Sequence, residues 1–176
     1  MRWKRSAARR PPRLWRSGPD AMARMTSGHM ARSLALLVPM ALLGGAYVSQ
    51  YGFGLYPCEM CWWQRYAHFA AIAIAVLAFA AKGQRGLVWL AGVAILASGL
   101  IGLFHAGVEY KWWPGFTRCA SLVATGGDPL AAIMEAPPIS CDQPQWTLLG
   151  ISLAGFNFLI STAGALGVFA LLRRAK

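Results

Sequence analysis

The chain has 176 residues, of which 57% are hydrophobic and only 13% are charged. A soluble globular domain is usually nearer half apolar and a quarter charged, so this composition argues against a soluble enzyme and against a disordered chain. The net charge of +11 does not indicate a nucleic-acid partner, because nine of the 17 basic residues precede Ser33. The basic character belongs to an N-terminal tail rather than to a binding groove.

Residues 1–30 form this tail. They combine Pro11 and Pro12 with scattered arginines and show little hydrophobic periodicity. Such a composition is typical of a disordered segment. We therefore predict a basic, disordered tail over residues 1–30 and a single membrane domain over residues 31–176.

Four long stretches with few or no charges follow the tail. An α-helix needs about 20 consecutive apolar residues to cross a bilayer, and a helix suits lipid because it satisfies its backbone hydrogen bonds internally. The alternative, a soluble bundle of very apolar helices, fits four such stretches poorly. We predict an all-α integral membrane protein, a four-helix bundle in the lipid bilayer, with helices over residues 31–50, 62–81, 86–107 and 146–172.

Lysine and arginine residues gather on one side of these predicted helices. The tail, the turn at 82–85 and the C-terminus carry fourteen of them, whereas the loops at about 51–61 and 108–145 carry only Lys111 and Arg118. Basic residues favour the cytoplasmic side of a membrane. Both termini are therefore expected in the cytoplasm and the two loops on the outer, periplasmic side.

All four cysteines lie in these outer loops or at their edges: Cys58, Cys61, Cys119 and Cys141. The space outside a bacterial inner membrane is oxidising, so disulfides persist there. The first two form a C-x-x-C motif, whose short loop gives a strained and readily exchanged disulfide. Four cysteines permit three pairings, and the simplest joins the first two and the last two. The last two share the long loop, for which a short helix over 129–135 is expected.

Three other uses of the cysteines are less consistent with the sequence. A c-type haem site requires C-x-x-C-H, but Trp62 follows the second cysteine. A four-cysteine zinc site usually takes two close pairs, and only one is present, so no metal is expected. Structural disulfides are typical of secreted domains that lack a core, whereas this chain has a membrane-buried core. Thiol–disulfide exchange is the best remaining interpretation.

Electrons that leave a thiol pair at the membrane surface need an acceptor at that depth, and a lipid-soluble quinone is one. Arg65 lies four residues after Cys61 on the same helical face. It could hold a quinone oxygen, stabilise quinol charge or favour a cysteine thiolate; equally, it could reach the lipid head groups. His105, the one ionisable residue of the third predicted span before Glu109, could serve the quinone, transfer protons or only pack. His68 shares the face of Cys61, but the sequence suggests no role for it.

Several stretches together resemble one family. Residues 57–65, PCEMCWWQR, resemble the P-C-x-x-C-x-x-[QE]-R signature of the disulfide bond formation protein B (DsbB) family. Residues 102–109 are similar to the end of the family's third helix, and Cys119 with the run CDQPQW at 141–146 completes the pattern. The resemblance covers about residues 31–172.

The resemblance implies a function for the whole chain. It implies a quinone-dependent thiol–disulfide oxidoreductase that reoxidises a periplasmic DsbA-like dithiol oxidase and passes the electrons to the membrane quinone pool, with ubiquinone as the quinone. Such a protein lies in the bacterial inner membrane with several spans, and no nucleic acid is expected as a partner.

The resemblance also implies a role for each site residue. Cys119 forms the mixed disulfide with the partner, and Cys141 is its mate. Cys58 exchanges with the long loop, and Cys61 lies nearest the quinone. Two further residues are implied to be neighbours of the quinone: Arg65 and His105.

Two alternatives stay open from the residues alone. The chain could be a non-catalytic membrane scaffold or a metal-binding protein that uses the four cysteines as ligands. It could also be a reductive enzyme that moves electrons in the opposite direction, as quinone-epoxide reductases do. The metal and quinone contents of the purified protein would distinguish the first alternative from a quinone-dependent oxidoreductase. Thiol oxidation measured with and without quinone would test the second alternative.

Overall fold

The computed structural model describes residues 19–81, 84–115 and 140–175. Its helices are α1 (Pro19–Phe53), α2 (Glu59–Ala80), α3 (Arg85–Glu109) and α6 (Leu153–Arg174). The two short strands β1 (Thr147–Leu148) and β2 (Ile151–Ser152) pair antiparallel just before α6. All four helices are long and apolar enough to cross a membrane.

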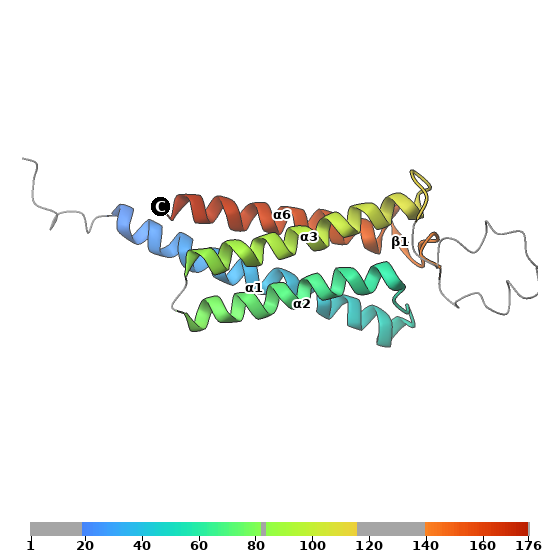
Figure 1. Ribbon diagram of the computed structural model, residues 1–176, viewed down its shortest axis with the longest axis horizontal. Coiled ribbons are helices and arrows are strands. Elements are labelled where there is room, and N and C mark those ends of the chain that lie inside the picture. Colours follow the sequence, from blue (N-terminus) through green and yellow to red (C-terminus); the bar gives the residue numbers. More distant parts are fainter. Residues whose placement is uncertain (1–18, 82–83, 116–139, 176) are drawn as a thin grey trace, which may run out of the picture.

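The four helices lie side by side in one elongated bundle that runs up, down, up and down (Figure 1). The α1–α2 connection and the β-hairpin lie together at one end, and the C-terminus lies at the other end beside the start of α1. The predicted all-α membrane bundle is confirmed, because four apolar helices of spanning length pack against one another. The short helix expected over 129–135 lies outside the described residues.

The first helix begins earlier than the hydrophobic pattern suggested. It starts at Pro19 rather than at residue 31, and proline suits the first position of a helix because its fixed φ matches helical geometry and its missing N–H needs no partner there. A charge-poor stretch marks only the part of a helix that lipid can cover. The polar first part of α1 extends beyond the lipid, so the hydrophobic pattern did not predict it. Residues 1–18 lie outside the described part, and their disorder stays a prediction.

The last helix begins later than expected, at Leu153 rather than at residue 146. Residues 147–152 form the hairpin, whose turn has Leu149 and Gly150 at φ values of +52° and +78°. Two consecutive residues with positive φ are typical of a two-residue hairpin turn. Ser152 then caps α6 by accepting a backbone N–H of its first turn at 3.1 Å. The predicted helical start was wrong because apolar composition alone does not distinguish a hairpin from a helix.

Small residues allow α3 and α6 to approach closely. A Cβ atom on Gly102 would lie 2.9 Å from the carbonyl oxygen of Ala154, and one on Gly164 would lie 2.9 Å from Cγ1 of Val38 on α1. Small residues at such positions bring helix backbones together where lipid offers no competing hydrophobic force. The close α3–α6 contact positions the site described below, because α3 and α6 each contribute a polar side chain to it.

We predict that Gly102→Ala destabilises the protein. The added methyl group would meet a backbone oxygen, which cannot move aside without separating the helices, so a loss of about 1–3 kcal/mol is expected. Thermal unfolding in detergent measures it. Gly44→Ala is the matched control: a Cβ there meets nothing within 4 Å, so this variant should be neutral or stabilised by up to about 1 kcal/mol. Equal stability of the two variants would contradict the packing argument.

Candidate thiol–disulfide site

The described site residues gather at one end of the bundle, where α2 begins and α3 ends. Five of the six residues predicted from the sequence are described there: Cys58, Cys61, Arg65, His105 and Cys141. The sixth, Cys119, lies outside the described residues. The sequence therefore identified residues that are far apart in the chain but close in space.

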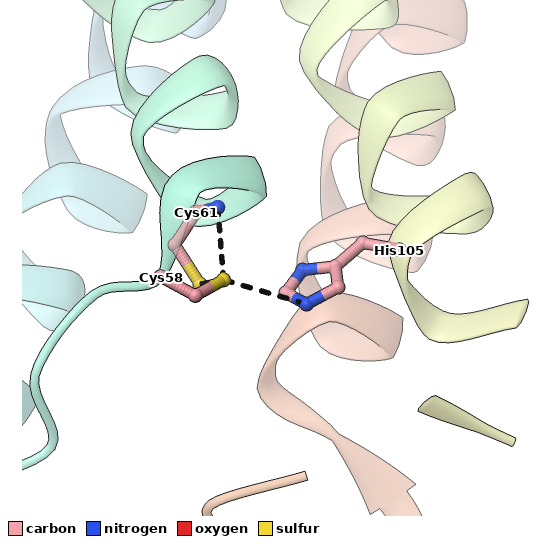
Figure 2. A group of neighbouring side chains, drawn as sticks. All are labelled: Cys58, Cys61 and His105. Atoms are coloured by element: carbon pink, nitrogen blue, oxygen red, sulfur yellow. Dashed lines mark hydrogen bonds between the residues drawn. The ribbon is translucent and has the colours of Figure 1, made fainter. Parts of the chain in front are cut away.

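The C-x-x-C motif forms the first turn of α2. Cys58 is the N-cap: its backbone is extended, and its sulfur accepts the backbone N–H of Cys61 at 3.3 Å. The turn brings the two Sγ atoms to 2.9 Å, with the Cys58 thiol donating to the Cys61 sulfur (Figure 2). The positive end of the helix dipole lies at this point and favours a thiolate. The two sulfurs are therefore held as a dithiol within reach of disulfide formation.

Cys141 reaches this pair from the far end of the long loop. Its side chain is fully buried and packs with Cys58 and Val108. Hydrogen bonds of the Cys58 thiol with Cys141 and Cys61, together with burial, raise the pKa of Cys58 far above its ordinary value. Cys58 is therefore a protonated thiol placed between two other sulfurs.

An exposed ion pair joins the end of α3 to the segment that carries Cys141. Lys111, just after α3, has a φ of +60°, and its Nζ donates to the backbone oxygen and to Oδ2 of Asp142, both at 2.7 Å. The ammonium of Lys111 and the donated hydrogen bond from Ser140 hold the pKa of Asp142 below its usual range. The carboxylate stays ionised at neutral pH, so this contact joins the loop end to the residue that follows α3.

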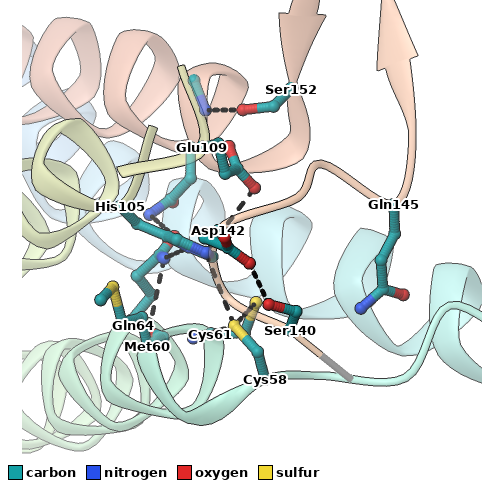
Figure 3. Close-up of polar contacts among 12 residues, drawn as sticks. Cys58, Met60, Cys61, Gln64, His105, Glu109, Ser140, Asp142, Gln145 and Ser152 are labelled. Atoms are coloured by element: carbon teal, nitrogen blue, oxygen red, sulfur yellow. Dashed lines mark hydrogen bonds and ion pairs between the residues drawn. The ribbon is translucent and has the colours of Figure 1, made fainter. Parts of the chain in front are cut away.

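His105 faces the thiols from α3. Its Nε2 lies 3.6 Å from Sγ of Cys58 (Figure 2) and 3.6 Å from Oε1 of Glu109. On the other side of the ring, Nδ1 lies 3.0 Å from the amide nitrogen of Gln64 (Figure 3). His105 is only 2% exposed, so its hydrogen bonds are made to protein atoms rather than to bulk water.

The neighbours of His105 determine which ring nitrogen carries the proton. Asn157 donates its amide N–H to the backbone oxygen of Ser98 at 3.1 Å and to Oε1 of Gln64 at 2.7 Å. The Nε2 of Gln64 donates to the backbone oxygen of Met60 at 3.3 Å. Backbone carbonyls only accept, so both amides have one possible orientation. Nδ1 of His105 therefore accepts, and in the neutral ring Nε2 carries the proton and points it at the thiols.

Gln64 and Asn157 are site residues that the sequence reasoning missed. Gln64 lies in the stretch 57–65 that resembles the family signature, but the sequence suggested no role for it or for Asn157. A signal was present for Asn157, because a lone amide in an otherwise apolar membrane helix needs a hydrogen-bond partner on another helix. Gln64 follows Cys61 by three residues and therefore shares its helical face.

Arg65 is buried rather than extended toward the lipid head groups. It is 5% exposed, and its guanidinium donates to Oε1 of Gln50 at 2.6 Å and to the backbone oxygen of Ala46 at 3.2 Å. The same group lies over the rings of Tyr47 and Trp62, at 4.9 Å and 5.1 Å from their centroids. These contacts with α1 and α2 place a fixed positive charge beside the thiols.

A cavity of about 370 Å³ adjoins the thiols and is enclosed mainly by α1, α2 and α6. This volume is within the range of small-molecule sites, which are mostly apolar with a few polar groups that orient the ligand. Its polar side chains include Cys61, Gln64, Arg65, His68, His105 and Asn157. Apolar walls with a sulfur and a guanidinium suit a quinone head group, which is flat and carries oxygens that accept hydrogen bonds. The residues present therefore fit a quinone.

The same sulfurs are also metal-type donors. Sγ of Cys58, Sγ of Cys61 and a ring nitrogen of His105 all lie within 4.8 Å of one another, and thiolate and imidazole are the donors that zinc prefers. Geometry alone thus allows soft-metal binding or thiol exchange at this point. The hydrogen bond between the two sulfurs and the adjoining apolar cavity favour thiol exchange.

A four-helix membrane protein with a helix-capping dithiol beside an apolar cavity belongs to the class of membrane thiol–disulfide oxidoreductases. The family model described as "Disulfide bond formation protein DsbB" matches residues 29–171. The chain is 32% identical over 171 residues to disulfide bond formation protein B of Polaromonas sp. (strain JS666 / ATCC BAA-500), covering 88% of this chain and 94% of that one. No solved structure is significantly similar to this chain. The chain belongs to the DsbB family.

Two further proteins are also similar to this chain over most of its length. Disulfide bond formation protein B of Aromatoleum aromaticum is 33% identical over 148 residues, which is 77% of this chain and 85% of that one. An uncharacterised protein of Rickettsia prowazekii is 24% identical over 132 residues, 72% of this chain and 77% of that one. Family membership makes the protein an oxidoreductase that reoxidises a DsbA-type protein with quinone. It decides against the non-catalytic scaffold and against the reductive alternative.

We predict that Gln64→Glu moves the proton of the neutral His105 ring from Nε2 to Nδ1. A carboxylate accepts where the amide donated, so Nδ1 would become the donor. Nitrogen chemical shifts of ¹⁵N-histidine-labelled protein in detergent distinguish the two tautomers. Gln145→Glu is the matched control, because Gln145 also lines the cavity but donates to the backbone oxygen of Tyr56. An Nδ1–H ring in the unmodified protein would contradict the assignment.

Proposed function

We propose that electrons pass from a periplasmic DsbA-like dithiol to Cys119–Cys141, then to Cys58–Cys61, and then to ubiquinone. The single observation that carries this order is the position of Cys58, which contacts Cys61 on one side and Cys141 on the other. When Cys58 and Cys61 form a disulfide, a Cys141 thiolate beside Cys58 can attack its sulfur and Cys61 leaves as the thiolate. Disulfide exchange needs that contact, because the attacking sulfur must reach the sulfur under attack.

The long loop supplies the partner-facing end of the route. The family resemblance assigns to Cys119 the mixed disulfide with the partner, with Cys141 as its mate. The support from the described residues is that Cys141 is anchored beside Cys58 by the Lys111–Asp142 ion pair. The sulfur that leaves when the partner attacks Cys119 is thus already placed next to its acceptor.

The cavity supplies the quinone-facing end. The quinone, when bound, is the two-electron acceptor of the reaction. Arg65 is the residue that would hold one of its oxygens, since a guanidinium offers several N–H donors and a positive charge at a site with little water. His105 supports the thiol side of the cavity, because its Nε2–H points at Cys58 and stabilises negative charge on the sulfurs. Cys61, which lines the cavity, is the sulfur that faces the quinone.

The distribution of charge supports the proposed orientation in the membrane. The fourteen-to-two distribution of lysine and arginine supports cytoplasmic termini and a periplasmic dithiol. In the fold, the start of α1 and the C-terminus lie at one end of the bundle, and the start of α2, which carries the C-x-x-C motif, lies at the other (Figure 1). In the proposed orientation, the described cysteines lie on the oxidising side of a bacterial inner membrane.

We predict that Arg65→Ala raises the KM for a soluble short-chain ubiquinone while thiol exchange persists. Loss of a buried hydrogen bond from a charged group should raise this KM by about tenfold to a hundredfold. The measurement is the rate of oxidation of a reduced DsbA-type protein as a function of quinone concentration. Exchange with that protein in the absence of quinone reports separately on the cysteines.

Arg85→Ala is the matched control for this experiment. Arg85 also donates to backbone oxygens, those of Leu172 and Ala175, but at the opposite end of the bundle. Its removal should leave the quinone KM unchanged. An Arg65→Ala protein with normal quinone kinetics would return Arg65 to a structural role that joins α1 to α2.

A further inference from the structure

His68 is a buried imidazole that the proposed electron route does not use. It lies three residues after Arg65 on α2, is 3% exposed and lines the cavity. Its Nδ1 atom is buried and has no hydrogen-bond partner among the residues that the structure describes. An unsatisfied buried polar atom is costly, so an unsatisfied one at a cavity wall points to a ligand that supplies the missing partner.

The neighbour of His68 determines what this partner can be. Nε2 of His68 lies 2.9 Å from Oδ1 of Asn157. That atom is an oxygen because the amide nitrogen of Asn157 donates to the backbone carbonyl of Ser98, and Ser161 also donates to it at 3.0 Å. Nε2 therefore carries the proton of the neutral ring. Nδ1 is left with a lone pair that can only accept a hydrogen bond.

We propose that Nδ1 of His68 accepts a hydrogen bond from a hydroxyl of the quinol, so that the cavity binds the reduced quinol more tightly than the oxidised quinone. This inference rests on the proposed quinone-reducing function and deepens it. The oxygens of a quinone only accept hydrogen bonds and so meet a second acceptor at His68. A quinol hydroxyl donates and therefore satisfies it.

Arg65 and His68 thus have different roles in the same cavity. A guanidinium is a donor only, so Arg65 serves a quinone oxygen before reduction and a hydroxyl oxygen after it. His68 accepts only, so it makes its hydrogen bond after reduction. Arg65 provides affinity for either form, whereas His68 distinguishes the two.

This distinction favours the forward reaction. In the reaction one S–S bond and two O–H bonds form: the dithiol loses two electrons and two protons, and the quinone gains both to become the quinol. A ligand site that prefers the product raises the reduction potential of the bound quinone. A tenfold preference corresponds to about 30 mV for a two-electron couple.

The test compares the equilibrium affinities of the two ligand forms. The full-length protein carries Cys58→Ser and Cys61→Ser, so it cannot exchange electrons with the ligand. Ubiquinone with a single isoprenoid unit, or its quinol under anaerobic conditions, is titrated in detergent with tryptophan fluorescence as the readout. Adding His68→Leu should weaken quinol binding about tenfold and change quinone binding less than about threefold, as expected for one buried hydrogen bond.

Two further variants separate recognition from folding. His68→Gln keeps a donor for Asn157 and an acceptor for the ligand, so it should restore the preference for quinol. Thr162→Val removes another buried oxygen that has no partner among the described residues; because Thr162 is not among the lining residues of the cavity, the preference should not change.

The outcomes are distinct. Equal weakening of both forms in His68→Leu, or an unchanged ratio of the two affinities, would overturn the role of His68 while leaving the quinone site intact. Failure of the parent protein to bind either form would instead overturn the proposed quinone site, and this inference with it. A preference that follows His68→Leu and His68→Gln in the expected directions would establish it.

Discussion

The contact of Cys58 with two other sulfurs is the interaction on which the rest of the site depends. As the N-cap of α2, Cys58 has its position fixed by helix geometry rather than by a flexible loop. The helix turn sets Cys61 at 2.9 Å, and the Lys111–Asp142 pair brings Cys141 to its other side. Exchange between a loop disulfide and a membrane-edge disulfide then requires little movement of the described segments.

Around these sulfurs, the apolar bundle strongly favours arrangements in which buried polar groups are hydrogen-bonded. A water-poor membrane interior makes an unpaired polar atom costly. The amides of Gln64 and Asn157 are paired by hydrogen bonds that connect α2, α3 and α6. The same bonds orient the rings of His105 and His68. Structural hydrogen bonds therefore specify which nitrogen of each neutral imidazole ring carries the proton.

Much of the fold could be predicted from the sequence, because lipid imposes long apolar helices. The helix ends were harder to predict. The hairpin turn at Leu149–Gly150 has the same apolar composition as a helix, so composition did not reveal it. For the site, the C-x-x-C spacing, the charge at Arg65 and the isolated His105 carried clear chemical signals. Gln64 and Asn157 did not, because their roles arise from contacts between residues 93 positions apart, which no local pattern reveals.

The most direct test of the central claim asks which sulfur pairs with Cys141. A full-length protein with Cys61→Ser and Cys119→Ser retains only Cys58 and Cys141, and mild oxidation followed by peptide mapping detects a disulfide between them. We expect rapid, intramolecular formation of this bond. A matched protein with Cys58→Ser and Cys119→Ser, which retains Cys61 and Cys141, should form its bond much more slowly. Equal rates in both proteins, or no bond in the first, would contradict the place of Cys58 between the two pairs.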